Sequence, residues 1–308
     1  MKRSIYSPKQ VFPASLRLAG EACREKRPGK GRPPIYPKRL YVALWLFRVY
    51  FALPYRAVEP MLQDRFPDLP CPRFPAWRWF LQTKVSWALL QRLFQRLKQP
   101  LSPWLPQEEP VLWALDASGF SYRAKSQGMP WHRGKRLRGM RAHTRLCVVI
   151  RYFPKARRLL IEAVQVGPGY ASDAKLGRKA LAQGDLLPGT WLADAGFDAG
   201  PVFEQADRAG LPATIRRKRG GVVRHPHRRQ AQERFDRQVY RLRAVAEGVF
   251  GGRKTRQNGP FHELLDATAM KRTILEVICY NLRFYLSLFV FLLRRLFRHG
   301  TLTWRTIF

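Results

Sequence analysis

After a proline-rich stretch at residues 100–110, the sequence changes from helical patterns to a succession of short strands and helices. Three predicted strands come first, followed by a helix, a strand, a helix, a strand and a final helix. The predicted strands cover Val111–Ala117, Ala142–Tyr152, Arg158–Val166, Thr190–Asp194 and Pro212–Arg216, and the helices between them cover Asp173–Gln183 and Ala199–Ala209. This order predicts an α/β fold whose first three strands form an antiparallel meander.

The same order of elements is that of a ribonuclease-H-like mixed β-sheet flanked by helices. In such a sheet the first and fourth strands lie side by side. Here the first strand carries Asp116 at the end of its apolar run, and the fourth ends in Asp194. Each carboxylate therefore stands where a buried strand emerges, and the adjacency of the strands predicts that the two carboxylates meet.

A glutamate further along the chain completes a candidate set of three acids. Tyr240, Arg243, Glu247 and Lys254 are separated by three, four and seven residues. At about 100° per residue this spacing predicts one face of a helix, although a glycine pair before Lys254 marks an earlier helix end. Two strand-end aspartates and a helical glutamate form a candidate cage for a divalent cation, because Mg²⁺ and Mn²⁺ prefer oxygen ligands.

The first hundred residues predict a helical module. Residues 1–37 are rich in Lys, Arg, Pro and Gly and are interpreted as a basic arm or linker. Apolar helices are predicted over 39–51 and 77–98. Such a module either reads DNA through a helix-turn-helix or dimerises, and the sequence contains no base-contacting pattern that decides. We expect two domains: 1–105, the basic arm with a helical DNA-binding or dimerisation module, and 106–308, the ribonuclease-H-like catalytic domain with a C-terminal apolar helix.

The charge of the chain indicates a polyanionic partner. There are 57 Lys and Arg against 21 Asp and Glu, which gives a formal charge of +36. Unpaired like charge on this scale destabilises a compact fold unless a partner neutralises it. Arginines cluster at residues 216–219 and 224–229, and guanidinium groups bind phosphate through paired hydrogen bonds. Nucleic acid is the leading candidate, although each cluster alone also fits a solvated loop.

Cysteine usage and the terminal segments predict a cytoplasmic protein. The four cysteines form no Cys-x-x-Cys pair, which fits a reducing compartment. His225 and His227 have no nearby cysteine or acid, so we interpret them as part of a basic loop rather than a zinc site. The start of the chain has no apolar core of signal-peptide length. The apolar run Phe284–Leu293 is shorter than the ~20 residues that cross a bilayer, which predicts a buried or dimer-facing helix.

Several motifs, taken in order, resemble one family. The chain is similar to the bacterial insertion-sequence transposases that are named for an Asp-Asp-Glu active site, in the branch with a Tyr-x2-Arg-x3-Glu-x6-Lys signature. All four signature positions are matched. Further similarity lies in Gly31-Arg-Pro-Pro34 with the later Leu-Pro-Tyr-Arg-Ala, and in Arg138–His143, Gly167–Asp173 and Ala193–Asp198. One departure is Ala195, where many members have a more polar residue after the second aspartate.

The resemblance implies a DNA transposase that cuts an insertion sequence at its terminal inverted repeats and transfers the strand to target DNA. The implied catalytic residues and ligands of two Mg²⁺ ions, or Mn²⁺, are Asp116, Asp194 and Glu247. The implied accessory residues near the DNA strand are Tyr240, Arg243 and Lys254. Double-stranded DNA is the implied partner. Because two DNA ends must be held together, we expect a homodimer on DNA, associated with the bacterial nucleoid.

Each of these residues, taken alone, has a structural explanation. A strand-end aspartate is often a cap or turn former. Glu247 fits an exposed helix face on which it pairs with Arg243, and Tyr240 either contacts DNA or packs in the core. Asp173 and Asp198 are substitute ligands, although the first fits a helix-start acid and the second a helix N-cap.

Two alternative functions remain at this point. One is a catalytically inactive, DNA-binding transposase remnant. The other is a metal-dependent nuclease on the same sheet that does not join strands.

Overall fold

The computed structural model divides the chain into two compact units. One consists of Met1–Leu105 with Leu275–Phe308, and the other of Pro106–Ile274. The predicted assignment of functions to residues 1–105 and 106–308 stays a prediction. The structure describes residues 6–23, 35–104, 112–125, 131–132, 135–136, 141–153, 158–183, 186, 189–210, 212–218, 223–244, 247–251 and 261–298.

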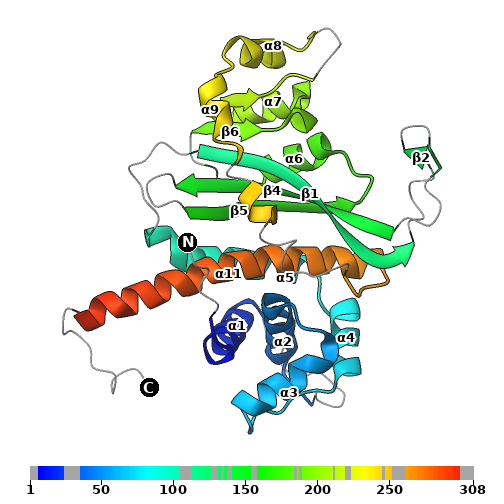
Figure 1. Ribbon diagram of the computed structural model, residues 1–308, viewed down its shortest axis with the longest axis vertical. Coiled ribbons are helices and arrows are strands. Elements are labelled where there is room, and N and C mark those ends of the chain that lie inside the picture. Colours follow the sequence, from blue (N-terminus) through cyan, green and yellow to red (C-terminus); the bar gives the residue numbers. More distant parts are fainter. Residues whose placement is uncertain are drawn as a thin grey trace. The chain divides into compact units, whose positions relative to one another are not determined.

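The described part of the first unit is helical (Figure 1). Its elements are α1 (Pro8–Ala22), α2 (Lys38–Phe51), α3 (Tyr55–Arg65), α4 (Phe74–Thr83), α5 (Trp87–Lys98), the short 3-10 helix η1 (Gln99–Trp104) and the later part of α11 (Asp266–Arg298). The helix α2 is apolar on nearly every side and is buried over most of its length. Two hydrogen bonds tie α11 to it: the Cys279 thiol donates to the Leu46 carbonyl at 3.3 Å, and the Arg283 guanidinium donates to the Tyr50 carbonyl at 2.9 Å.

The interpretation of residues 1–37 as a basic arm is wrong for α1. This helix begins with Pro8 after Ser7, and the side chain of Gln10 accepts a hydrogen bond from the Ser7 backbone N–H at 3.0 Å. Such a reciprocal cap satisfies N–H groups that have no partner within the helix. The apolar side chains of α1 pack on α2 and α5. The capping pattern and the helical spacing of Val11, Phe12 and Leu18 indicate this helix in the sequence. The high content of Lys and Pro in residues 1–37 as a whole favours an irregular arm instead.

The single helix predicted over 77–98 is two helices. A connection of three residues separates α4 from α5, and the Ser86 hydroxyl caps α5 by accepting from the Leu89 N–H at 3.2 Å. At the other end of the chain, the run Phe284–Leu293 lies within α11, where Leu286 and Leu288 are buried. Among the described residues there is no helix with the length and apolar character that a membrane crossing requires.

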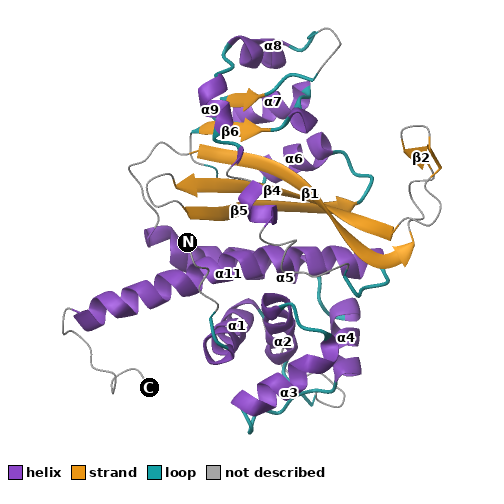
Figure 2. Cartoon of the chain, in the orientation of Figure 1, coloured by secondary structure: helices purple, strands orange, loops and turns teal. Residues whose placement is uncertain are grey.

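The second unit contains a five-stranded mixed sheet (Figure 2). The strands are β1 (Leu112–Lys125), β4 (Arg141–Phe153), β5 (Arg158–Pro168), β6 (Thr190–Ala193) and β7 (Ala213–Ile215). Their order across the sheet is β5-β4-β1-β6-β7, with β1, β4 and β5 antiparallel and β6 and β7 parallel to β1. This confirms the ribonuclease-H-like arrangement, including the adjacency of the first and fourth predicted strands. A separate hairpin pairs β2 (Trp131–His132) with β3 (Lys135–Arg136).

Helices cover the sheet and close its core. The helix α6 (Asp173–Leu181) packs on β1, β4 and β5, and α7 (Gly200–Arg208) packs on β7. Trp113, Trp191 and Phe197 are almost completely buried in this core. The short helices α8 (Pro226–Glu233) and α9 (Arg237–Arg241) both contact β7. The basic loop predicted around His225 and His227 is therefore the start of a helix, with Pro226 in its first turn.

Candidate active site

The two strand-end aspartates lie on adjacent strands at the same edge. The parallel ladder between β1 and β6 ends at Leu115, opposite Ala193. Asp116 and Asp194 are the next residues along the two strands. Both carboxylates therefore follow the carboxyl end of the parallel pair, where open α/β sheets bind their ligands.

Asp116 nevertheless does not end its strand, and the predicted end at Ala117 is wrong. β1 continues to Lys125 because β4 is long enough to pair with it through Ser121 and again at Lys125. Asp116 faces Val148 on this antiparallel side. At Asp116 the pairing of β1 with β6 has ended, whereas its pairing with β4 continues. Asp116 is therefore held within a strand and does not begin a loop.

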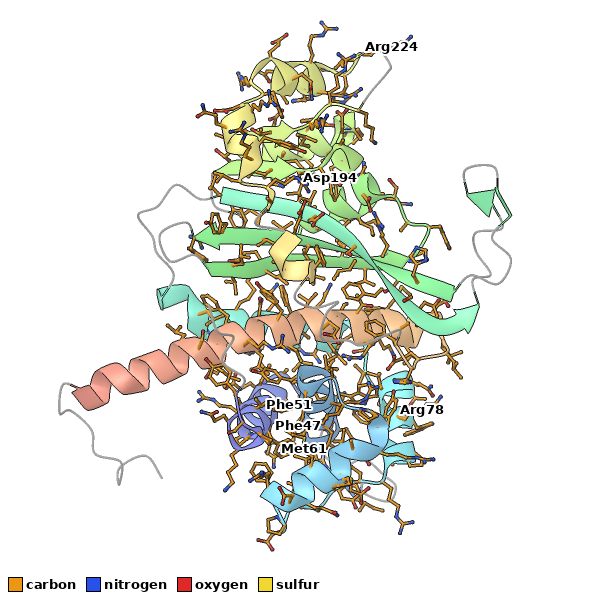
Figure 3. The ribbon with its side chains drawn as sticks, in the orientation of Figure 1. Phe47, Phe51, Met61, Arg78, Asp194 and Arg224 are labelled. Carbon is orange, nitrogen blue, oxygen red and sulfur yellow. The ribbon has the colours of Figure 1, made fainter. Side chains whose placement is uncertain are left out.

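Asp194 ends β6 and forms a tight turn (labelled in Figure 3). Its Oδ1 atom accepts a hydrogen bond from the Gly196 N–H at 2.8 Å, which caps the 3-10 helix η2 (Ala195–Phe197). A Cβ atom at Gly196 would lie 2.8 Å from that same Oδ1 atom and 3.3 Å from Oδ2 of Asp173. A side chain at position 196 would therefore shift the Asp194 carboxylate from its present position.

The electrostatics of Asp116 connect the three predicted acids. The pKa of Asp116 is raised to about 6. Burial is the largest cause, and the negative charges of Asp194 and Glu247 add to it, whereas the Ala117 N–H and the Arg243 charge act in the opposite direction. The Ala117 N–H donates to its Oδ1 atom at 2.9 Å. Residues far apart in sequence therefore act on one buried carboxyl group. Perturbation of this kind is typical of functional sites, although ion-pair networks also produce it.

The third acid is held by a cation. The Nη2 atom of Arg243 lies 2.8 Å from Oε1 of Glu247, and the Glu247 side chain is 61% exposed. This is the i,i+4 pair that the structural explanation of Glu247 anticipated. The continuous helix expected from residue 240 onward is wrong, because α9 ends at Arg241 and a turn follows before residues 247–251 are helical again.

The accessory residues are only partly described. The Arg243 guanidinium lies 6.0 Å from the centre of the Tyr240 ring, and that ring lies 5.3 Å from Phe235. Tyr240 is half-buried. Lys254 lies outside the described residues. Tyr240, Arg243 and Glu247 thus form a chain of neighbours even though no single helix carries them.

Both substitute carboxylates are engaged by arginine. Asp173 is the first residue of α6 and pairs with Arg145 of β4, whose Nε atom donates to Oδ1 at 2.5 Å. Hydrogen bonding to Asp173 raises the pKa of Arg145, and the charge of Asp194 adds to the effect. Asp198 is not the N-cap of α7, which is Ala199; it forms a buried ion pair with Arg228 instead.

The donor chemistry of the site fits a hard divalent cation. Asp116 is a buried carboxylate beside a second carboxylate, and carboxylate oxygen is what Mg²⁺ binds. In the part of the chain that the structure describes, no three His, Cys, Asp or Glu side chains are gathered closely enough to hold a metal ion. Two of the three predicted ligands are therefore adjacent on the sheet, and the third is paired with Arg243.

Two cations near the site were not identified from the sequence as site residues. Arg145 directly precedes the buried apolar run Leu146–Ile150 of β4, and a cation at the end of such a run was the available signal. Lys218 brings its ammonium group within 3.4 Å of the Gly196 carbonyl. It was seen only as one member of a basic cluster, because its neighbours across the fold are remote in sequence.

Comparison with known proteins supplies the family. The family described as "Transposase DDE domain" matches residues 108–282, which is more than half of the 308 residues. An uncharacterized protein of Aquifex aeolicus (strain VF5) is 27% identical over 259 residues, covering 80% of this chain and 78% of that protein. No solved structure gives a significant match. By this match over more than half of its length, and in agreement with its mixed sheet, this chain belongs to the family of transposases with a DDE domain.

Proposed function

We propose that this protein cuts DNA at the terminal inverted repeats of an insertion sequence and joins the released strand to target DNA. The observation that supports this proposal is the position of Asp116 and Asp194, which directly follow the paired ends of two parallel neighbouring strands. The charges of Asp194, Glu247 and Arg243 all act on the buried carboxyl group of Asp116. The family implies DNA as the partner and divalent metal ions as the cofactor. The reaction itself and the roles of individual residues are our inference.

In this proposal Asp116, Asp194 and Glu247 hold Mg²⁺ or Mn²⁺. A pair of such ions, when bound, stabilises the attacking and leaving oxygens of an in-line phosphoryl displacement. The two aspartates follow paired strands of the sheet, whereas Glu247 would serve as a ligand only without its contact with Arg243. Arg243 is then available to neutralise a DNA phosphate. We assign Tyr240 and Lys254 accessory contacts with the same strand.

The partner proposed is double-stranded DNA, as both terminal repeat and target. A formal charge of +36 suits a polyanion of this kind. Two DNA ends must be brought together for joining, so we propose a homodimer on DNA. Association with the bacterial nucleoid follows from the same charge and partner.

The proposed reaction is tested with the full chain and the DNA that flanks its coding region. We expect labelled flanking duplexes to be cut in Mg²⁺ and joined to a target plasmid, and both products to disappear in EDTA. Joining depends on the 3′-hydroxyl that cleavage frees at the end of the element. The matched control is therefore a duplex already cut at that position, which ends there either in a normal nucleotide or in a dideoxynucleotide; only the first should be joined. Hydrolysis without any joined product would favour a simple nuclease. Binding with neither product would favour an inactive remnant.

A second prediction concerns the turn at Gly196. We expect Gly196→Ala to lower cleavage by about 10- to 100-fold, because a Cβ atom 2.8 Å from Oδ1 of Asp194 must displace that carboxylate, and a misplacement of about 1 Å can remove about 10²-fold. Gly20→Ala in α1 is the control, since its Cβ would meet nothing closer than 4.0 Å. Single-turnover cleavage rates measure both variants. Wild-type rates for Gly196→Ala would show that the position of Asp194 does not matter.

A further inference from the structure

One stretch of the second unit has strong positive charge and no acid of its own. Residues 208–232 contain eight Lys and Arg and no Asp or Glu. Its described cationic parts are residues 216–218 and 223–229, which we call the basic segment. The first part follows β7 and the second leads into α8. A run of like charges is usually a solvated surface without a specific function. The contacts of the basic segment with the rest of the unit show whether it is held in one arrangement.

A buried carboxylate outside the segment anchors it at both ends. The Asp198 side chain is completely buried, and its Oδ2 atom accepts a hydrogen bond from the Lys218 backbone N–H at 2.7 Å. Its Oδ1 atom accepts from Nε of Arg228 at 2.6 Å. One carboxylate thus fixes two points of the basic segment that lie ten residues apart in sequence. A buried pair of this kind is poor evidence for stability, but it can fix one arrangement of the chain.

The anchor belongs to the turn that carries Asp194. Asp198 directly follows η2, the 3-10 helix that Asp194 caps. The Lys218 ammonium group also reaches the Gly196 carbonyl, at 3.4 Å. The basic segment is therefore tied to the same few residues that position the second aspartate of the candidate active site.

The outer cations of the segment form no ion pair with any acid in the part of the chain that the structure describes. These cations are Arg216, Arg224 and Arg229, and all three are exposed. Figure 3 shows Arg224 at the outer end of this unit, away from Asp194. The surface thus extends outward from the candidate active site, which suits a long polyanion better than a small one.

We propose that the basic segment is a binding surface for the DNA backbone, held in place by Asp198. The inference rests on the proposed function, since it takes DNA as the partner. Arginine binds phosphate bidentately, and each phosphate contact releases counterions from the duplex. Asp198 is in this view a positioning residue, and Lys218 is the cation of the segment whose ammonium group contacts the turn after Asp194.

Salt dependence tests the surface directly. In the triple variant Arg216→Gln, Arg224→Gln and Arg229→Gln, the slope of log affinity against log salt should become shallower by about 2.7, or about 0.9 for each lost phosphate contact. The probe is a short fluorescein-labelled duplex, titrated by anisotropy in EDTA. The control removes three exposed cations of α6, Lys175, Arg178 and Lys179, by the same change to Gln. A wild-type slope, an equal change in the control, or equal competition by polyglutamate would overturn the proposal.

The anchor is tested by a neutral substitution that removes no cation. Asp198→Asn should weaken binding of the same probe by about tenfold, because the segment is no longer fixed. Asp207→Asn is matched to it, since Asp207 also pairs with α8, through His227, but at the surface. Equal affinities for the two variants would overturn the role of Asp198, and if Asp198→Asn does not fold, the triple variant still decides. Both tests measure DNA binding in the absence of cleavage. The binding surface can therefore be refuted while strand joining is confirmed, and strand joining can be refuted while the binding surface is confirmed.

Discussion

Replacing Asp116 with asparagine should abolish DNA cleavage while making the folded protein more stable at neutral pH. Asparagine cannot supply the charge that holds a metal ion, so we expect the cleavage rate to fall by at least about 10³-fold, or ~4 kcal/mol of barrier. DNA binding should be retained, because the overall positive charge is unchanged or increased. Single-turnover cleavage in Mg²⁺ and anisotropy in EDTA measure the two effects separately.

The gain in stability has a defined pH window. The folded chain raises the pKa of Asp116 from 3.8 to about 6, so the folded state binds this proton more tightly than the unfolded state does. Stability contributed by the protonated group is therefore present below about pH 4 and is lost as the pH rises to about 6. Above that pH the folded protein carries a buried charge whose cost is up to about 3 kcal/mol.

Asp116→Asn removes this penalty, and chemical denaturation without metal should show it. We expect a higher free energy of unfolding than wild type at pH 8, and no difference near pH 4. Asp68→Asn, at an exposed position of the first unit, should change neither stability nor cleavage. If Asp116→Asn cleaves as wild type does, the assignment of the site is wrong. If it is instead less stable at pH 8, the carboxylate has a structural role.

The neighbouring positions of Asp116 and Asp194 could be predicted because each follows an apolar run. A buried strand has a run of apolar residues that can be recognised in the sequence. The order of strands and helices then allows only a few topologies. The apolar run does not show where a strand ends when its partner strand extends further. Beyond Ala117, only the inward alternation of Phe120 and Tyr122 marked the rest of β1.

The part of the site that follows β7 could not be derived in the same way. Arg243 and Glu247 have ideal spacing for one helix, yet the chain turns between α9 and residue 247. The spacing of residues shows which side chains would share a helix face, but it does not show whether the helix is continuous between them. The bond between Asp198 and Arg228 joins residues 30 positions apart. The sequence around Asp198 and around Arg228 does not indicate that the two residues pair. An acid after a turn also fits a helix N-cap.

Replacing Gly177 with valine should destabilise the second unit and disable the site together. Gly177 lies in α6, and a Cβ atom there would stand 2.8 Å from Cδ2 of Leu115 and 2.8 Å from Cδ1 of Phe197. Both neighbours are fully buried, so neither can move into open space. We expect the free energy of unfolding to fall by about 3 kcal/mol, the upper part of the usual range for overpacking.

The loss of cleavage should exceed what unfolding alone explains, because both displaced residues adjoin the candidate ligands. Leu115 immediately precedes Asp116, and Phe197 lies in the turn that Asp194 caps. Gly248→Val is the matched control, since a Cβ at Gly248 meets nothing within 4 Å, and its stability should stay within about 0.5 kcal/mol of wild type. Equal unfolding midpoints in urea for the two variants would contradict the close approach of α6 to the sheet, whereas cleavage lost only in proportion to unfolding would show that this packing supports the fold without positioning the acids.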